Sequence, residues 1–299
     1  MKSTITGALA VTSVSTLRGW EASPHLEPMK STQVFGQTIR YHDVGSSTGP
    51  ALVLLHGAPG NALLSWGKVI EPLAAKHRVL AMDQIGFGAS DKPGIDYRVQ
   101  TYVDFLAEFL RQQQIGDFIL VGVSFGGWVA AQYTVQSLQT ESAASHEGKL
   151  PAPKKLILCD SGGLSLKLPP QFLDNLVPGS LAAQEASMRA LVYDQSLVTD
   201  EAVRDLFIST MAADGGGTIR SIMNSLASST EWIDGKLAAI TIPTLLVWGV
   251  EDHIVPIERG IQLAAGIPNA RLETIEKCGH APMVEKPGKF LAVVDSFLQ

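Results

Sequence analysis

The chain has 299 residues, of which 45% are hydrophobic and 17% charged, and its formal net charge is −6 at pH 7. This composition is typical of a globular protein with a sizeable core, and its basic residues do not cluster, which argues against nucleic acid as a partner. The longest apolar runs are far shorter than a bilayer span, so the sequence predicts no membrane-spanning helix.

Residues 1–30 are predicted to lie outside the fold. Lys2 precedes a short apolar stretch at residues 5–11, which resembles a weak signal peptide but lacks a clear cleavage site. We therefore expect a flexible leader and a cytoplasmic protein, with export as the alternative.

Short apolar runs that stop at polar or glycine-rich residues predict the buried strands of one sheet. These runs cover residues 51–55, 79–82, 118–123, 156–159 and 244–248, with strand-like patterns also at 38–44 and 271–275. Helical patterns follow the same alternation, at residues 99–114, 125–138, 257–265 and 289–298. Strands that alternate with helices indicate the α/β class, with a mostly parallel central sheet covered by helices on both faces.

Two stretches interrupt this alternation. Residues 140–153 are polar and contain two prolines, which predicts an exposed loop. Residues 161–240 carry helical patterns around 181–193, 199–211 and 219–228 and no convincing strand. We expect residues 161–240 to form a helical cap inserted into an α/β-hydrolase-like core of residues 31–160 and 241–299. A helical pair packed elsewhere on the core is the alternative.

The segment Gly122–Gly126 carries the most informative chemical motif. A strand-like run ends at Ser124, glycines lie two residues away on either side, and a helical pattern follows. This is the Gly-x-Ser-x-Gly nucleophile elbow, in which a sharp strand-to-helix turn exposes the serine. Glycine is needed where the strand and the helix come too close for side chains. A glycine-rich turn that merely contains a serine is the alternative, and the other motifs decide between the two.

The glycine-rich loop His56–Gly60 directly follows the first of the buried runs. Its N–H at Ala58, together with the N–H of Phe125 at the start of the next helix, is expected to bind a developing oxyanion. His56 itself is expected to order the loop rather than to act as a base. Asp83 ends the next strand and is interpreted as structural, because in this motif the acid follows the serine along the chain.

A serine nucleophile needs a neutral imidazole to accept its proton. The downstream candidates are His146, His253 and His280. His146 lies in the polar loop and is expected to be solvated. His253 directly follows Asp252, and a local structural role is expected for it. His280 lies on a loop after the last strand pattern and is the predicted base.

The base needs a carboxylate that fixes its tautomer and stabilises the imidazolium. Asp252 follows the run at 244–248 and is the predicted acid, while its neighbour Glu251 is expected to point elsewhere. Asp160, at the end of the preceding strand, is the alternative acid.

This chemistry calls for no cofactor and no metal ion. Cys159 and Cys278 lack the spacing of a metal site or a disulfide framework, and we expect two reduced thiols. The expected partner is a small-molecule ester, and a homodimer is left open.

Four motifs in this order resemble the α/β-hydrolase superfamily over residues 32–299. They are the loop His56–Gly60, the loop Asp83–Ser90, the elbow at Ser124, and the segment 248–256 together with Gly279 and His280. The resemblance implies that fold and a Ser124, Asp252 and His280 triad. The serine separates the chain from haloalkane dehalogenases and soluble epoxide hydrolases, which carry an aspartate nucleophile.

A narrower resemblance links residues 191–201 and 158–164 to hydrolases that cleave a carbon–carbon bond in ring-fission products of aromatic compounds. Those enzymes usually carry asparagine where Val123 stands and tryptophan where Ala281 stands. Their substrate-binding arginine falls on Leu206, although another arginine stands two residues before it. A pocket without that arginine should bind neutral substrates better than carboxylates.

The sequence therefore favours a serine carboxylesterase that acts on small or medium acyl esters. The first alternative is a carbon–carbon bond hydrolase of 2-hydroxy-6-oxo dienoates with the same triad. A non-catalytic ligand receptor on the same fold is less favoured, because all the parts of a triad are present.

Overall fold

The computed structural model describes residues 26–141, 150–165, 176–212, 216–227 and 231–299. Most of the predicted leader and the whole segment around His146 lie outside these residues. The strands are β1 (Lys30–Val34), β2 (Gln37–Val44), β3 (Ala51–Leu55), β4 (Val79–Met82), β5 (Phe118–Val123), β6 (Lys155–Cys159), β7 (Thr244–Gly249) and β8 (Ala270–Ile275). The helices are α1 (Ala62–Trp66), α2 (Ile70–Ala74), α3 (Val99–Gln112), α4 (Phe125–Glu141), α6 (Leu181–Leu191), α7 (Asp200–Ala212), α8 (Gly217–Ala227), α9 (Ile257–Gly266), α10 (Pro282–Glu285) and α11 (Pro287–Leu298).

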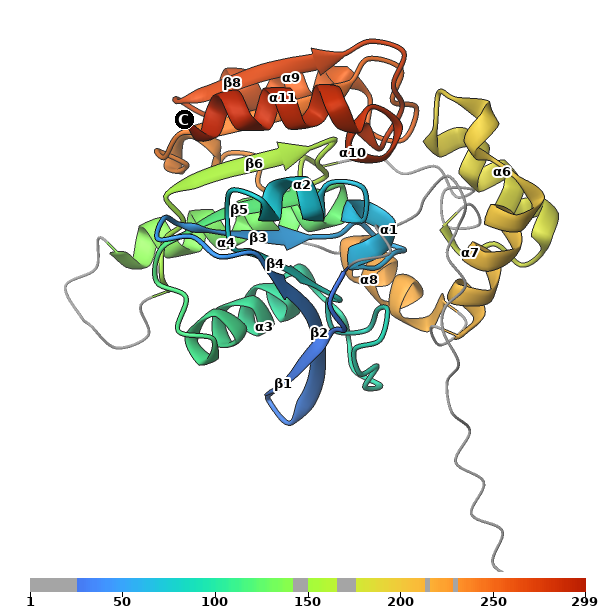
Figure 1. Cartoon of the computed structure of the whole chain (residues 1–299), viewed down its shortest axis with the longest axis horizontal. Coiled ribbons are helices and arrows are strands. Elements are labelled where there is room, and N and C mark those ends of the chain that lie inside the picture. Colours follow the sequence, from blue (N-terminus) through green and yellow to red (C-terminus); the bar gives the residue numbers. More distant parts are fainter. Residues whose placement is uncertain (1–25, 142–149, 166–175, 213–215, 228–230) are drawn as a thin grey trace, which may run out of the picture.

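The strands form one eight-stranded sheet in the order β1-β2-β4-β3-β5-β6-β7-β8. β1 and β2 pair antiparallel with their neighbours, whereas every pair from β4 to β8 is parallel. The predicted α/β class with a mostly parallel sheet is confirmed. In Figure 1 the arrows of β3, β6 and β8 point to the side on which α6 and α7 lie, and the other parallel strands run in the same direction. Ligands of such sheets bind beyond that edge.

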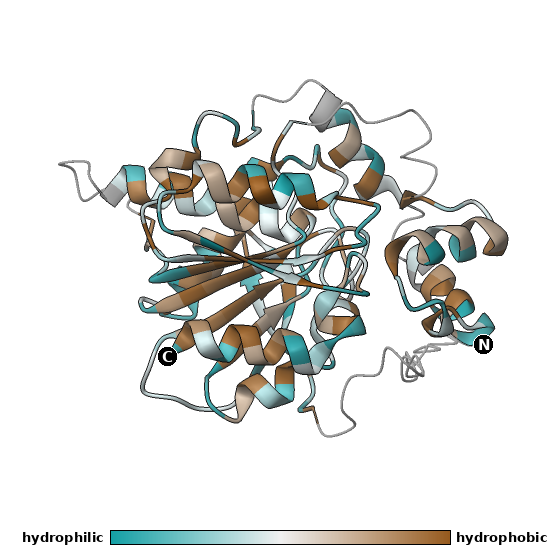
Figure 2. Ribbon diagram, turned by 90° about the horizontal axis from the view of Figure 1, so that it is seen from above, coloured by the Kyte–Doolittle hydropathy of each residue, from teal (hydrophilic) through white to brown (hydrophobic). Residues whose placement is uncertain are grey.

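Helices cover both faces of the sheet, which explains why its central strands are apolar throughout (Figure 2). Every residue of β3 and β5 is buried, and each fully buried leucine or valine contributes about 1.5–3 kcal/mol to folding. One face packs against α1, α2, α10 and α11, where Trp66 and Phe290 are fully buried. The other face packs against α3, α4 and α9. No helix among the described residues is long and apolar enough to span a membrane.

The first strand begins inside the stretch assigned to the leader. β1 has a single buried residue, Val34, and pairs only with β2 at the edge of the sheet. An edge strand of this kind carries no apolar run, so the pattern that identifies the central strands does not detect it. The boundary at residue 30 is therefore slightly too late, since Lys30 already pairs with Tyr41.

The two ends of the segment between β6 and β7 lie next to each other and are joined by hydrogen bonds. The Ile233 N–H donates a hydrogen bond to the Gly163 carbonyl over 2.9 Å. Close by, the Asp234 carboxylate accepts the N–H of Ser165 over 2.8 Å. The helices α6, α7 and α8 of this segment lie beyond the sheet edge, and Met188 and Ala202 are buried in a small core shared by α6 and α7.

The turn from β5 into α4 requires glycine. Ser124 lies in the left-handed region at a φ of 54°, which non-glycine residues adopt only where their surroundings hold them there. A Cβ atom on Gly126 would collide with the backbone carbonyls of Leu55 and His56. The turn therefore brings the first turn of α4 into direct contact with the end of β3.

We expect Gly126→Ala to lower the free energy of unfolding by about 3 kcal/mol, because neither backbone segment can move away without breaking the sheet. Chemical unfolding monitored by fluorescence measures the change. Gly94→Ala is the matched control: Gly94 is exposed, and an added Cβ there would meet no atom. Equal stability of the two variants would contradict the close approach.

Candidate active site

The motif residues meet at a cavity of about 600 Å³ beyond the carboxyl ends of β3, β5 and β7. Ser124, Ala58, Phe125 and His280 all line it, although they come from three different segments of the chain. Asp252 lies behind His280, away from the cavity. Another hollow, of about 530 Å³, lies at the surface near α3 and contains none of the predicted site residues.

The backbone of Ser124 is held from both sides. Its N–H donates to the Cys159 carbonyl over 3.0 Å, and its carbonyl accepts the N–H groups of Gly162 over 3.0 Å and Trp128 over 3.2 Å. These bonds fix the left-handed conformation and leave the side chain at the cavity wall. The geometry is that of a half-buried serine that lines the cavity from a rigid turn.

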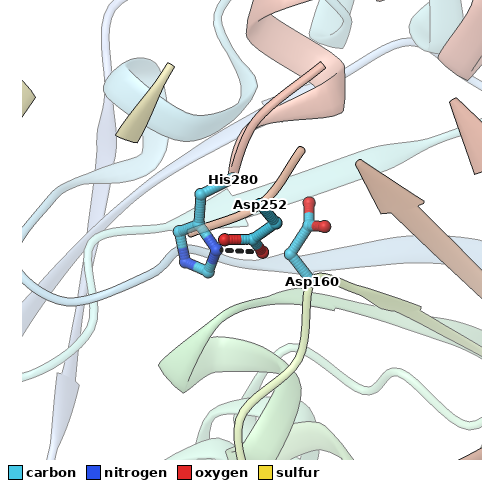
Figure 3. Close-up of side chains that lie close together, drawn as sticks. All are labelled: Asp160, Asp252 and His280. Carbon is cyan, nitrogen blue, oxygen red and sulfur yellow. Dashed lines mark hydrogen bonds and ion pairs between the residues drawn. The ribbon is translucent and has the colours of Figure 1, made fainter. Parts of the chain in front are cut away.

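His280 and Asp252 form a buried pair (Figure 3). The His280 Nδ1 lies 2.7 Å from the Asp252 Oδ2. The second carboxylate oxygen, Oδ1, accepts the N–H groups of Ile254 over 2.7 Å and Val255 over 2.9 Å. Because Nδ1 donates its hydrogen to the carboxylate, the neutral ring carries its lone pair on Nε2. A ring held in this way can accept a proton from a group in the cavity.

Asp160 lies beside this pair, and Figure 3 shows Asp252 between it and His280. The side chain is fully buried, its Oδ1 accepts the Gly249 N–H over 2.9 Å, and its Oδ2 has no hydrogen-bond partner among the described residues. Burial, and secondly the nearby Asp252 charge, raise the pKa of the Asp160 carboxyl well above its usual range. Asp160 therefore keeps its proton, and it is Asp252 that contacts the histidine.

The ligand-type atoms of Asp160, Asp252 and His280 lie within 4.8 Å of one another, a separation that a metal site would also show. Most of these atoms already take part in hydrogen bonds within the protein. The His280 Nδ1 bonds to Asp252, and one oxygen of each carboxyl accepts backbone N–H groups. A proton retained by Asp160 accounts for the closeness of two carboxyl groups without a cation.

Two residues of the cavity wall have a backbone N–H group without a partner among the described residues. Within the described part of the chain, no hydrogen bond uses the N–H of Ala58 or the N–H of Phe125. Both residues line the cavity on either side of Ser124, and Phe125 is the first residue of α4, where N–H groups have no helical acceptor. These are the donors that the sequence predicts.

His56 and Asp83 are fully engaged in holding loops. The His56 Nε2 accepts the Gln84 N–H over 3.0 Å, its Nδ1 bonds to the Gly57 carbonyl over 2.7 Å, and burial lowers the pKa of the ring. Asp83 accepts the N–H groups of Ala62 and Ala89 over 2.8 and 2.7 Å. These bonds match the structural roles expected from the sequence.

The remaining candidates do not join the pair. The Glu251 carboxylate accepts the Cys278 N–H over 2.9 Å and so points away from His280. His253 is exposed at the cavity rim. His146 lies outside the described residues.

Sequence reasoning missed Glu285, which joins the His280 loop to the segment between β6 and β7. One carboxylate oxygen accepts the Gly279 N–H over 2.7 Å, and the other accepts the N–H groups of Tyr193 and Asp194 over 2.8 and 2.9 Å. The His280 N–H itself donates to the Leu191 carbonyl over 2.7 Å. Because these partners lie about 90 residues apart in the chain, no local pattern could identify Glu285.

The cavity wall is almost entirely uncharged. Its described lining residues include no Asp, Glu, Lys or Arg. Leu206 of α7 lies where the resemblance would place an arginine, and it contributes to the lining. Trp128 and Trp232 stack at 4.3 Å between ring centres and form one apolar side of the cavity.

Comparison with known proteins gives consistent results. A family model described as "alpha/beta hydrolase fold" matches residues 50–287. The chain is 30% identical over 276 residues to the 2-hydroxy-6-oxo-2,4-heptadienoate hydrolase of Pseudomonas putida, covering 88% of this chain and 93% of that protein.

Two solved structures share the fold across nearly the whole chain. A membrane phospholipase A, described as a bacterial virulence factor, superposes with a TM-score of 0.78 at 25% identity and covers 92% of this chain and 87% of its own. A mutant of the meta-cleavage product hydrolase CumD of Pseudomonas fluorescens superposes with a TM-score of 0.77 at 25% identity and covers 90% of this chain and 97% of its own. Both names describe hydrolases.

The protonated state of Asp160 predicts a pH dependence of stability. A carboxyl whose pKa is raised by folding stabilises the folded protein fully below about pH 4, and this stability is lost as the pH rises towards the folded pKa. Asp160→Asn removes the titration, so its stability relative to the wild type should grow by up to about 1.4 kcal/mol per pH unit within that window. Chemical unfolding at several values between pH 5 and pH 8 measures this slope.

Asp96→Asn makes the same chemical change at an exposed residue and should show no such slope. A flat difference for Asp160→Asn would mean that Asp160 is ionised in the folded protein.

Proposed function

Because the chain belongs to the alpha/beta hydrolase fold family and is a hydrolase, we propose that it is a serine carboxylesterase acting on small or medium acyl esters. The observation that carries the proposal is the buried His280–Asp252 pair behind a cavity whose wall includes Ser124. In this proposal residues 161–240 form the cap, and residues 31–160 and 241–299 form the core that holds the triad.

The reaction follows from the positions of these groups. The His280 Nε2 accepts the Ser124 hydroxyl proton while Oγ attacks the ester carbonyl, and the N–H groups of Ala58 and Phe125 bind the resulting oxyanion. The tetrahedral intermediate then collapses, the C–O bond to the alcohol breaks, and His280 returns the proton to the leaving oxygen. Water repeats the sequence on the acyl-enzyme and releases the acid.

Asp252 orients the ring and stabilises its charged form in both halves of the cycle. Its two backbone N–H donors hold the carboxylate in place, so the pair needs no rearrangement as charge develops. Asp160 contributes as a neutral neighbour that does not touch the histidine.

The lining of the cavity supports a neutral substrate. A carboxylate placed there would lose its hydration with no cationic side chain among the described lining residues to replace it. Leu206, Val123 and Ala281 all line the cavity, and they stand where the carbon–carbon bond hydrolases usually carry polar or aromatic groups. An ester of an apolar acid suits such a wall better than a dienoate anion.

Carbon–carbon bond hydrolysis is the second candidate. The observation that favours it is the 30% identity to a dienoate hydrolase over nearly the whole chain. The same triad could serve that reaction, so the two candidates differ in the pocket and not in the nucleophile.

Ser124→Ala should lower kcat for ester hydrolysis by about 10⁴- to 10⁶-fold and leave the fold intact, since only the attacking oxygen is removed. The measurement is p-nitrophenyl ester turnover, together with fluorophosphonate labelling of Ser124 in the wild type. Efficient turnover of a 2-hydroxy-6-oxo dienoate with little ester turnover would reverse the order of the two candidates. A folded wild-type protein that forms no adduct would instead indicate a ligand receptor.

Asp252→Asn should lower kcat for the esters by about 10⁴-fold, because an amide at this position holds the wrong tautomer of His280. Asp160→Asn should stay within about tenfold of the wild type, because Asp160 is neutral already and the amide retains its shape. Steady-state kinetics on one ester measures both variants. The reverse order would assign the acid to Asp160.

A further inference from the structure

The cap helix α6 places a buried amide in the otherwise apolar cavity. Gln184 is 3% exposed, its side chain lines the cavity, and its Oε1 has no hydrogen-bond partner among the described residues. A buried amide oxygen without a partner costs free energy that folding alone does not recover. A ligand that completes its hydrogen bonds would recover that cost.

The position of Gln184 is set by the helix and not by a loose loop. Ser180 caps α6 by accepting the Ala183 N–H over 3.2 Å, and Leu191 at the other end accepts the His280 N–H over 2.7 Å. Gln184, Ser187 and Leu191 recur at the spacing of one helix face, and all three line the cavity. The Leu191 end of this face is therefore anchored to the loop that carries the proposed base.

The separation between Gln184 and Leu191 along α6 indicates which part of a substrate the amide would contact. Gln184 lies seven residues before Leu191, which is about 10 Å at 1.5 Å per residue. The reacting carbonyl must lie near Ser124 and His280, next to the Leu191 end. The amide consequently faces a part of the substrate several bonds away from the bond that breaks.

We propose that the Gln184 amide and the Ser187 hydroxyl form a subsite for an uncharged hydrogen-bonding group, such as an ether, carbonyl or hydroxyl oxygen, in the distal part of the substrate. Both side chains can donate and accept, so they suit a neutral group of either kind. This inference rests on the proposed function for one feature only, the use of Ser124 as the nucleophile.

A purely structural role explains the amide less well. Gln132 also has a buried, unpartnered carbonyl oxygen, but it does not line the cavity and so cannot meet a substrate. Gln184 differs because it is one of the few polar side chains in a wall formed mainly by leucine, methionine, tryptophan and small residues. A leucine or methionine there would pack equally well against an alkyl chain.

The test compares two fluorophosphonates of equal length, one with an alkyl tail and one with an oxyethylene tail, by their rates of Ser124 labelling. Gln184→Met is nearly isosteric and removes only the amide. It should lower the ratio of the ether-tail rate to the alkyl-tail rate by about five- to tenfold, the effect of one or two neutral hydrogen bonds. Ser187→Ala should lower the ratio in the same direction by a smaller factor.

Gln262→Met is the matched control, since it makes the same change on the exposed face of α9 and should leave the ratio at the wild-type value. An unchanged ratio in Gln184→Met would overturn the subsite. So would a wild-type protein that, although folded, reacts with neither probe.

Labelling requires only an activated serine and not ester turnover. If the wild type forms both adducts but hydrolyses no ester, the proposed esterase function fails, and the ratio still decides the role of Gln184. If esters are hydrolysed and the ratio does not respond to Gln184→Met, the esterase function stands and the subsite fails.

Discussion

The contact between α4 and the end of β3 is the constraint on which the site depends. Gly126 lies against the backbone carbonyls of Leu55 and His56. The Cβ atom of any other residue at this position would collide with them. This contact forces the chain to reverse at Ser124 within a single residue, in the left-handed conformation. It also brings the start of α4 beside the loop after β3, so that Phe125 and Ala58 line the same cavity. One steric condition thus places the proposed nucleophile and both residues whose N–H groups are proposed to bind the oxyanion.

The buried acidic groups are stable together because Asp160 retains its proton. Two ionised carboxylates so close together inside the core would repel each other strongly. Burial, and secondly the nearby Asp252 side chain, raise the pKa of the Asp160 carboxyl and so avoid this repulsion. The hydrogen bonds differ as well, since Asp252 has two backbone N–H donors and a histidine, whereas Asp160 receives a single N–H.

Much of the fold could be predicted from the sequence because its central strands are buried on both faces. The runs at β3, β4 and β5 are apolar throughout, and their predicted limits coincide with the observed ones. β1 escaped detection because an edge strand with one buried residue leaves no such pattern.

The candidate site could be predicted less completely. The elbow at Ser124 is a local motif, and its conformation follows from the neighbouring glycines. From the sequence, Asp252 could be ranked above Asp160 as the acid, but the choice could not be decided. Both residues follow strands of the same sheet, and only the distance of each carboxyl group to His280 distinguishes them. In the sequence, Gln184 has the pattern of an ordinary polar residue on an amphipathic helix, although it lines the cavity. Glu285 accepts hydrogen bonds from residues that are far away along the chain. Their environments depend on how the segment between β6 and β7 packs on the core, which local sequence does not encode.

The anchoring of α6 links substrate selection to catalysis. The Leu191 carbonyl binds the backbone of His280, and Glu285 binds both Gly279 and the residues that follow α6. A displacement of α6 would therefore disturb the loop that carries His280, the proposed base. The residues on the exposed face of the helix can consequently change more freely than the position of the helix. The side chains on its cavity face, in contrast, can change without disturbing these backbone bonds. Selection among substrates can then proceed through residues such as Gln184 and Ser187, while the geometry of Ser124, His280 and Asp252 stays fixed.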